Sequence, residues 1–398
     1  MPQARRTVYV FFHCHDGAVP DLAAFFEGTA GAIPVRQVHA ISLLRGEEYA
    51  VSREELDYAL SLPSDRWVEV EERDRPVVES LADKGVVITD LPDDELAALR
   101  HRDEVLASSG WNLYGAMHYL MTKWRDVDLR RSPHIGDFPI ITEQMIAEFI
   151  ELRGRPPDPF HTIENAIATV DLPLVDRDGG LYEALRRRKT TRGYDRAQRL
   201  TVEELATALY SVWVCHGTAP IIGDLFCLKR TSPSGGCLHP VEVYPVVSGV
   251  AGLESGVYHY NVRDHALELI ERLTDEEAVD LATRFVCGQA YFGSAHVAFV
   301  MTARFPRNHW KYPKQQKAYP VVLMDAAHLS QTLYLVAGDL GLGAFVTAAI
   351  NGLVIEERLG LDGVTEGAVA VAGCGRERPQ GSPLEPTFAP YVPRETTI

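Results

Sequence analysis

The spacing of apolar and polar residues predicts a succession of strands and helices, most of them in the second half of the chain. Short β-branched and apolar runs predict buried strands, whereas apolar residues at intervals of three and four predict helices that pack on them. Strands are expected at residues 241–248, 256–260, 297–302 and 367–373, and helices at 201–212, 275–285 and 321–340. The second half therefore has the elements of a large core.

The first 92 residues carry a smaller pattern of the same kind. Ser52 and Glu55 form a capping box in front of the apolar stripe Leu56, Ala59 and Leu60, which predicts a helix. A strand, a second helix and another strand are expected at residues 67–70, 76–85 and 86–89. This order resembles a winged-helix unit, which would offer a strand edge and a groove to an extended peptide. The alternative is a structural extension that only supports a dimer.

Residues 93 to 177 are expected to connect this unit with the second half. Helical spacing extends to about residue 125, and an aromatic and methionine stripe from Trp111 to Trp124 favours core or interface packing over a cofactor site. Residues 154 to 177 are rich in proline and aspartate and predict a linker. We therefore expect three parts, at residues 1–92, 93–177 and 178–398.

The overall charge and the cysteines exclude several classes of function. A net charge of −16 argues against nucleic acid as a partner. Six cysteines without a CxxC pair are typical of reduced thiols in a cytoplasmic protein. No targeting segment is recognised, and Asp325 and His328 interrupt the apolar stretch 321–350, so no membrane span is expected. The run His13-Cys14-His15 has no second ligand cluster near it in sequence, and we expect no metal site.

An island of positive charge, the basic loop (residues 186–199), contrasts with this acidic composition. Seven arginine and lysine residues lie within fourteen positions beside a single acid, Asp195. They precede a helix capped by Thr201 and Glu204, and a basic turn before a capped helix suits a phosphate monoester. The alternative is a solvated charged face. The basic residues are Arg186, Arg187, Arg188, Lys189, Arg192, Arg196 and Arg199.

A second candidate feature is the glycine loop (residues 232–240). Gly235 and Gly236 follow Pro233 and Ser234, and the loop leads into a predicted strand. Adjacent glycines allow a backbone to come close to a flat or anionic ligand. An ordinary turn is the alternative.

Three separated motifs carry a resemblance to a known family. They are Arg188 to Tyr194, Ser232 to Pro240, and a later group made of Lys311-Tyr312, Asp325 to Leu333 and Leu340 to Ala344. In order and spacing, over residues 180 to 376, they resemble the FMN-dependent nitroreductase superfamily, and within it the SagB-type dehydrogenases that act on ribosomally made peptides. The resemblance implies an α+β fold with a mixed or antiparallel sheet and flanking helices, FMN as cofactor, and a homodimer.

The resemblance also assigns residues to FMN. The basic loop would bind the flavin phosphate and ring edge, the glycine loop would hold the flavin across a dimer interface, and two backbone N–H groups would face its N5 and O4 edge. Such donors and cations stabilise the anionic charge of a reduced flavin. The assigned residues are Arg188, Lys189, Thr190, Arg192 and Arg376 in the first group, Pro233, Ser234, Gly235 and Gly236 in the second, and Ala348 and Ala349 in the third.

Lys311 and Tyr312 match an adjacent Lys-Tyr pair that is catalytic in the peptide azoline dehydrogenases. Oxidation of an azoline to an azole removes a proton and a hydride from neighbouring carbons, so the protein must supply a base. A tyrosine beside an ammonium group and a desolvated lysine both suit this role, and the sequence does not choose between them. A surface cation and a packing aromatic are the alternative roles.

The resemblance thus implies an FMN-dependent dehydrogenase in the maturation of a ribosomally synthesised peptide. The precursor peptide would be its substrate, and a ring-forming enzyme is a candidate partner. Two alternatives stay open. One is a flavin-dependent reductase of nitro, quinone or dehydroamino-acid substrates, and the other is a non-catalytic FMN-fold scaffold in a peptide-modifying complex.

Overall fold

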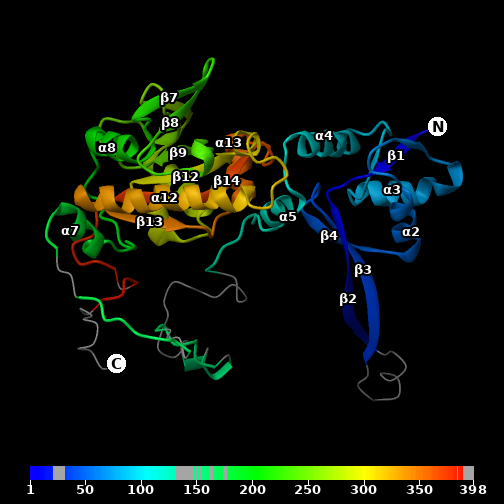
Figure 1. The fold of residues 1–398 in the computed structure, drawn as a ribbon, viewed down its shortest axis with the longest axis horizontal. Coiled ribbons are helices and arrows are strands. Elements are labelled where there is room, and N and C mark those ends of the chain that lie inside the picture. Colours follow the sequence, from blue (N-terminus) through cyan, green and yellow to red (C-terminus); the bar gives the residue numbers. More distant parts are fainter. Residues whose placement is uncertain are drawn as a thin grey trace.

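The computed structural model describes residues 1–20, 32–130, 147–148, 150–152, 154–160, 165–173, 177–382 and 384–388. These residues form a small N-terminal unit and a larger C-terminal domain, which α4 (Asp94–Ser108) and α5 (Leu113–Met121) connect (Figure 1). Both parts combine helices with antiparallel strands. The α+β class expected from the sequence is confirmed.

A six-stranded sheet forms the centre of the C-terminal domain. Its strand order is β11-β10-β9-β12-β14-β13, and every neighbouring pair is antiparallel. The central strands β9 and β12 are largely buried because their sequences are nearly continuous apolar runs. The strands are β9 (Val241–Val247), β10 (Gly256–Asn261), β11 (Ala266–Arg272), β12 (Val297–Arg304), β13 (Gly343–Thr347) and β14 (Glu366–Gly375).

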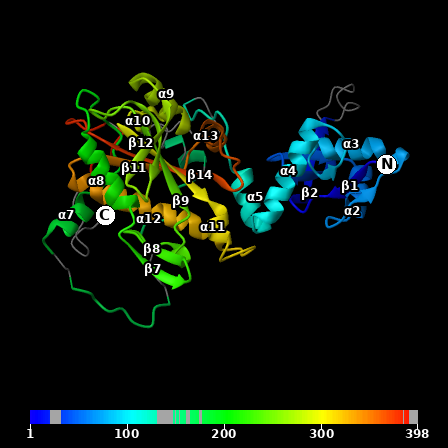
Figure 2. The same ribbon diagram turned by 90° about the horizontal axis from the view of Figure 1, so that it is seen from above.

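Helices cover both faces of this sheet (Figure 2). Phe299 of β12 packs in the hydrophobic cluster that includes α8 and α12, whereas its neighbour Val300 packs with α9, α10 and α13. This alternation follows from the two-residue period of a strand. The helices are α8 (Val202–Trp213), α9 (Asp275–Phe285), α10 (Ala290–Gly293), α12 (Ala318–Asp339) and α13 (Gly352–Leu359).

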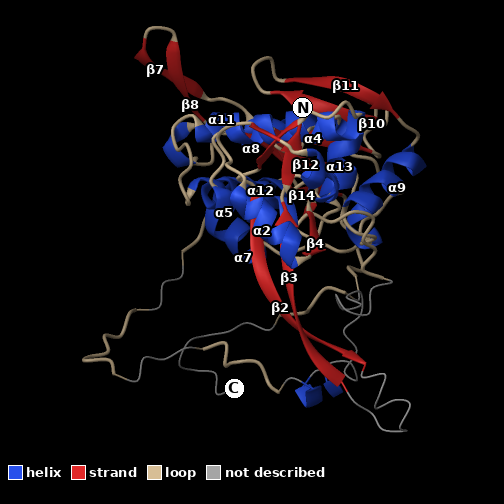
Figure 3. Cartoon of the chain, turned by 90° about the vertical axis from the view of Figure 1, so that its right-hand side faces the viewer, coloured by secondary structure: helices blue, strands red, loops and turns tan. Residues whose placement is uncertain are grey.

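The N-terminal unit contains two small sheets. β1 lies between β5 and β6, and β2, β3 and β4 form an antiparallel meander whose β2–β3 hairpin extends away from the unit (Figures 1 and 3). α2 begins at the expected capping box, with reciprocal hydrogen bonds between Ser52 and Glu55. The elements are β1 (Gln3–Arg6), β2 (Val10–Pro20), β3 (Ala32–Ser42), β4 (Glu47–Val51), α2 (Arg53–Ser61), β5 (Val68–Glu69), α3 (Arg75–Asp83) and β6 (Val87–Thr89).

Several elements differ from the sequence expectation. The continuous helix expected over residues 93 to 125 is two helices, because Gly110 adopts a φ of +78° between α4 and α5. The β2–β3 hairpin, β11 and the hairpin of β7 (Gly217–Ile222) and β8 (Leu225–Lys229) were not predicted. The β7 and β8 strands are mostly exposed although they carry apolar side chains such as Ile222 and Phe226.

The N-terminal unit and the C-terminal domain share one hydrophobic core. Leu43 and Ile88 belong to the same buried cluster as Trp111 of the connecting segment and side chains of α12. Beside this cluster, Lys123 Nζ and Glu356 Oε1 form a buried ion pair at 2.9 Å, which joins the end of the connecting segment to α13. The boundary at residue 92 stays a prediction, and the core runs across it.

α12 is the longest helix in the described part of the chain, and it crosses one face of the sheet. Its length and composition alone would suffice to cross a membrane, although its polar residues led us to expect otherwise. Its packing identifies it as a core helix, since Leu329, Leu333 and Ala337 are buried in the main hydrophobic cluster.

The described parts of the predicted linker are residues 154–160, 165–173 and 177. They contain neither helix nor strand, and their side chains are exposed. The first element after them is α7 (Gly180–Arg187), which leads into the basic loop.

Candidate functional site

One carboxylate of α12 holds the glycine loop in place. Asp325 accepts hydrogen bonds from Ser234 Oγ at 2.5 Å and from the Gly235 N–H at 3.0 Å. Ser234 Oγ in turn accepts a hydrogen bond from the His239 N–H at 2.9 Å. Burial raises the pKa of Asp325, and the hydrogen bonds from Ser234 and Gly235 oppose this rise. Contacts within the chain therefore set the shape of the loop.

Three residues of the glycine loop have left-handed backbone conformations. Gly236, Cys237 and His239 have φ angles of 67°, 62° and 46°. A left-handed conformation costs a residue with a side chain about 1–3 kcal/mol, so it persists only where its surroundings enforce it. Such strain clusters at ligand sites, which favours a functional role for this loop.

Lys311 and Tyr312 lie against the glycine loop, although 75 residues separate Lys311 from Gly236 along the chain. Lys311 Nζ is 3.5 Å from Gly236 O. A methyl group on Gly236 would come within 2.7 Å of Tyr312 Oη and 3.1 Å of Lys311 Nζ. Both the φ angle of Gly236 and this close approach favour glycine here. The structure brings the predicted catalytic pair and part of the predicted FMN site together.

α11 (Phe305–His309) and the turn after it present this pair. Asn308 is buried, and its Nδ2 donates a hydrogen bond to Ala318 O at 2.8 Å. Its carbonyl accepts the backbone N–H groups of Lys311 at 3.3 Å and of Tyr312 at 3.2 Å. Lys311 itself is exposed and Tyr312 is half-buried, with Lys311 Nζ 5.7 Å from the centre of the Tyr312 ring. The backbone of the pair is thus held in place while both functional groups stay accessible.

The basic loop lies toward the other end of α12, beside β13. The Arg188 guanidinium lies over the Tyr334 ring at 5.4 Å, and the Arg192 guanidinium lies over the Phe292 ring at 5.8 Å. Thr190 Oγ1 is 2.9 Å from Tyr334 Oη. Neither arginine side chain has a carboxylate partner in the part of the chain that the structure describes. These two cations are therefore open to an anion such as a phosphate monoester.

Two other predicted phosphate ligands have carboxylate partners within the chain. Lys189 Nζ is 3.0 Å from Glu385 Oε2 and also contacts Glu377. Arg376 Nη2 is 2.7 Å from Glu204 Oε1, in the first turn of α8. Each carboxylate offsets the positive charge that would attract a phosphate. The assignment of Lys189 and Arg376 stays a prediction, with weaker support than that of the two unpaired arginines.

Ala348 and Ala349 directly follow β13. The Ala349 N–H donates a hydrogen bond to Thr347 Oγ1 at 3.1 Å, and Ala349 O accepts one from Gln289 Nε2 at 3.4 Å. Ala348 is exposed. Because the Ala349 N–H already has a partner, a bound ring would have to replace that contact, and the role of this pair toward FMN stays a prediction.

The two groups of residues are separated along α12. Asp325 and Tyr334 are nine positions apart, which corresponds to about 13.5 Å along a helix axis. Both groups fit the chemistry of FMN. The unpaired arginines suit its phosphate, and the exposed backbone of Gly236 suits a flat ring, whereas Gly235 packs against Val321 of α12.

The two α12 side chains that organise these loops, Asp325 and Tyr334, have no role assigned by the sequence motifs. The role of Asp325 could have been recognised from the sequence, because an acid within an apolar helix needs hydrogen-bond donors when it is buried. The role of Tyr334 could not, since a tyrosine is ordinary in a core helix. Its role depends on Arg188 and Thr190, which reach it only in the folded chain.

The family model described as the nitroreductase family matches residues 185–376. The trifolitoxin-processing protein TfxB of Rhizobium leguminosarum bv. trifolii is 37% identical over 145 residues, which are 36% of this chain and 38% of TfxB. "Putative nitroreductase MJ1384" of Methanocaldococcus jannaschii is 29% identical over 192 residues, 48% of this chain and 90% of that protein. The microcin B17-processing protein McbC of Escherichia coli is 28% identical over 141 residues, 34% of this chain and 50% of McbC. This chain therefore matches half or less of the two processing proteins.

The family match contains the features described above. It includes the basic loop, the glycine loop, Lys311 with Tyr312, and all six strands of the large sheet. The N-terminal unit, α4 and α5 lie outside it. Residues 185–376 of this chain therefore match the nitroreductase family, as their sequence motifs predicted.

Proposed function

We propose that this chain is an FMN-dependent dehydrogenase that oxidises azoline rings in a ribosomally synthesised precursor peptide. One observation carries the proposal, namely the contact of Lys311 and Tyr312 with Gly236 in the glycine loop. Azoline oxidation requires a protein base next to the flavin, and this pair supplies two candidate groups at one place.

The chemistry of the reaction defines what the pair must do. Two C–H bonds break on neighbouring ring carbons, one releasing a proton and the other a hydride, and the electron pair left by the proton forms the new double bond. Bound FMN supplies the acceptor for the hydride. Tyr312 Oη or Lys311 Nζ takes the proton, and the second group of the pair lies close enough to influence the first electrostatically.

The residues that would hold FMN come from both loops. Arg188, Arg192 and Thr190 would bind the phosphate, where the two guanidinium groups provide charge-assisted donors. The exposed backbone of Gly236 would let the ring approach beside Lys311. This arrangement would position the reacting carbons of the substrate between the ring and the base.

Two relatives support a peptide substrate. TfxB and McbC are named as the processing proteins of trifolitoxin and microcin B17. Because this chain matches only part of each, its own substrate and partners belong to the proposal. A ring-forming enzyme is included as a partner, since an azoline must be formed before it is oxidised.

Exposed apolar side chains support a homodimer. Met324 on α12 is 57% exposed with Leu323 beside it, and Leu181 on α7 is 61% exposed with Leu185 one turn further on. A second copy would cover these side chains, because apolar surface of this kind favours protein contacts. The basic loop and the glycine loop both contact α12, which carries Leu323 and Met324, so this dimer interface would lie beside the FMN site.

A cleft of about 860 Å³ leads from the N-terminal unit to the turn that carries the catalytic pair. Tyr9 and Asp103 line it on one side, and Asn112 and Lys314 line it near the pair. Lys314 follows Lys311 by three positions. We place the precursor peptide in this cleft, with its leader segment added as a strand to the N-terminal unit.

A second candidate function is the reduction of nitro or quinone compounds. The similarity to MJ1384 over 90% of that protein favours it, because MJ1384 is itself named a putative nitroreductase. This reaction takes its electrons from a nicotinamide cofactor and needs no base at Lys311 or Tyr312.

The deciding experiment measures reduction of FMN in the full chain by an azoline-containing peptide without oxygen. We expect Tyr312→Phe or Lys311→Met to slow flavin bleaching by about 10²–10⁴-fold, the usual contribution of a positioned base. FMN content should not change in either variant. Lys317→Met, at an exposed lysine where α12 begins, is the matched control and should react at the wild-type rate.

Each other outcome has a defined meaning. Wild-type rates in both variants would contradict the catalytic role of the pair. Quinone reduction by NADH without any oxidation of peptide would support the second candidate function. A bound flavin that neither peptide nor NADH reduces would support the scaffold alternative.

A further inference from the structure

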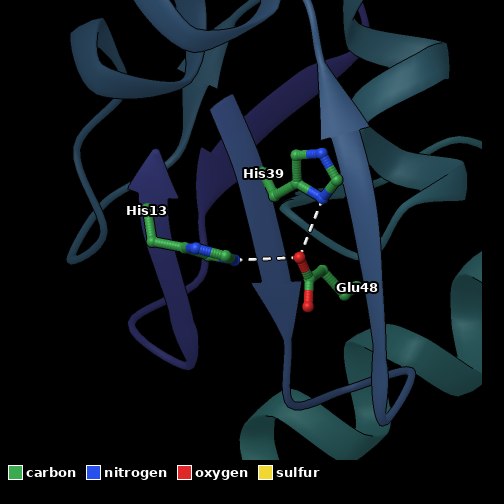
Figure 4. A group of neighbouring side chains, drawn as sticks. All are labelled: His13, His39 and Glu48. Atoms are coloured by element: carbon green, nitrogen blue, oxygen red, sulfur yellow. Dashed lines mark hydrogen bonds and ion pairs between the residues drawn. The ribbon is translucent and has the colours of Figure 1, made fainter. Parts of the chain in front are cut away.

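Three metal-ligand side chains meet on one face of the β2–β3–β4 sheet (Figure 4). His13 Nε2 is 2.9 Å from Glu48 Oε1, and His39 Nδ1 is 2.8 Å from the same oxygen. These three atoms all lie within 4.8 Å of one another. The cluster belongs to the N-terminal unit, outside the nitroreductase-family domain.

The register of the sheet explains the cluster. His13 pairs directly with His39 between β2 and β3, and His39 pairs with Ala50 between β3 and β4. Glu48 precedes Ala50 by two residues, so its side chain emerges on the same face. His15 lies on this face too, with its ring 5.5 Å from that of His39. The other two ligands are remote from His13 in sequence, and the sheet brings them to it from β3 and β4.

We propose that His13, His39 and Glu48 form a binding site for a divalent transition-metal ion of the zinc type. Imidazole nitrogens and carboxylate oxygens bind Zn²⁺ at about 2.0–2.2 Å. Tetrahedral geometry at that distance separates ligand atoms by about 3.4 Å, so the two hydrogen-bonded contacts need to open by roughly half an ångström. Three protein ligands leave a fourth position for water.

The charge of the cluster suits a cation. The carboxylate of Glu48 contributes negative charge, which a divalent ion would compensate. All three side chains remain partly exposed, so an ion can reach them. A bound ion would link three strands and fix the direction of the β2–β3 hairpin.

His259 offers a contrast within the same chain. Its Nδ1 is 2.8 Å from Glu268, whereas its Nε2 is 3.9 Å from Glu242. Because the two carboxylates lie on opposite ring nitrogens, they cannot share one ion with this histidine. Across the described ranges, only the β2–β3–β4 cluster gathers three suitable ligand atoms.

The experiment measures Zn²⁺ binding to the full chain after treatment with EDTA, by isothermal titration calorimetry. We expect one equivalent of Zn²⁺ to bind. His39→Ala should weaken the affinity at least about tenfold, because loss of a residue that only hydrogen-bonds to a metal ligand already weakens metal affinity by that factor. Glu48→Gln keeps the size and hydrogen bonding of the side chain, so it tests the ligand without disturbing the sheet. His259→Ala is the matched control and should bind as the wild type does.

A second readout uses Co²⁺ in place of Zn²⁺. The wild type should show the visible absorption of four-coordinate Co²⁺, and Glu48→Gln should lose it. Zn²⁺ affinity that is unchanged in both ligand variants, or no binding by the wild type at micromolar Zn²⁺, would overturn the proposal. A loss in His15→Ala as large as that in His39→Ala would contradict the proposed ligand set.

Discussion

Replacement of Asp325 tests whether the contact between α12 and the glycine loop controls FMN binding. Asp325→Ala removes the acceptor of two hydrogen bonds, from Ser234 Oγ and from the Gly235 N–H. A hydrogen bond to a charged group contributes about 1.5–3 kcal/mol, so the gross loss is about 3–6 kcal/mol. Burial raises the pKa of Asp325, which means that burying its carboxylate costs free energy. The variant avoids this cost, and that offsets part of the loss. We expect a net loss of about 1–3 kcal/mol in the free energy of unfolding.

The same variant should bind FMN about 10–100-fold more weakly, because binding would then have to order the free loop. This change corresponds to a loss of about 1.4–2.8 kcal/mol in binding free energy. Urea unfolding measures the stability, and quenching of flavin fluorescence measures the affinity. Asp325→Asn keeps one acceptor oxygen and should lose less in both assays. Asp339→Asn, at the exposed last residue of α12, is the matched control. If Asp325→Ala binds FMN with wild-type affinity, the carboxylate does not shape the site and our account of the glycine loop is wrong.

Three further predictions concern charge. Arg188→Ala should weaken FMN binding about 10–100-fold, because its guanidinium has no carboxylate partner among the described residues. Lys189→Ala should weaken it less, because that ammonium group is already paired, and equal losses in a flavin titration would contradict the difference. Burial lowers the pKa of His296 to about 4, against about 6.5 in an unfolded chain, so the stability present above pH 6.5 falls as the pH falls toward 4. Urea unfolding of His296→Gln should depend less on pH between 7.5 and 5, and an unchanged profile would refute this cause. Lys123→Met should cost about 3–5 kcal/mol by leaving Glu356 buried without its cation. Adding Glu356→Leu should restore most of that stability in chemical unfolding, and a double variant no more stable than the single one would argue against the pair.

The sequence by itself determined many of the local elements and the resemblance to the nitroreductase family. The capping boxes at Ser52 and Thr201 appear where they were predicted, because a cap depends on residues only three positions apart. The buried strands β9 and β12 were recognisable because their apolar runs are continuous. Three motifs together were sufficient to predict the nitroreductase family, since the residues within each motif are close in sequence.

Only the tertiary structure decided which distant residues meet. Gly236 and Lys311 lie 75 positions apart, and their contact depends on how α11 and α12 pack beside the glycine loop. Likewise, His13, His39 and Glu48 form one cluster only because the register of three strands places them on one face. Local patterns indicate which residues are buried, but they do not identify which strands pair or which loops meet, because both depend on free energies of contact between segments that are remote in sequence.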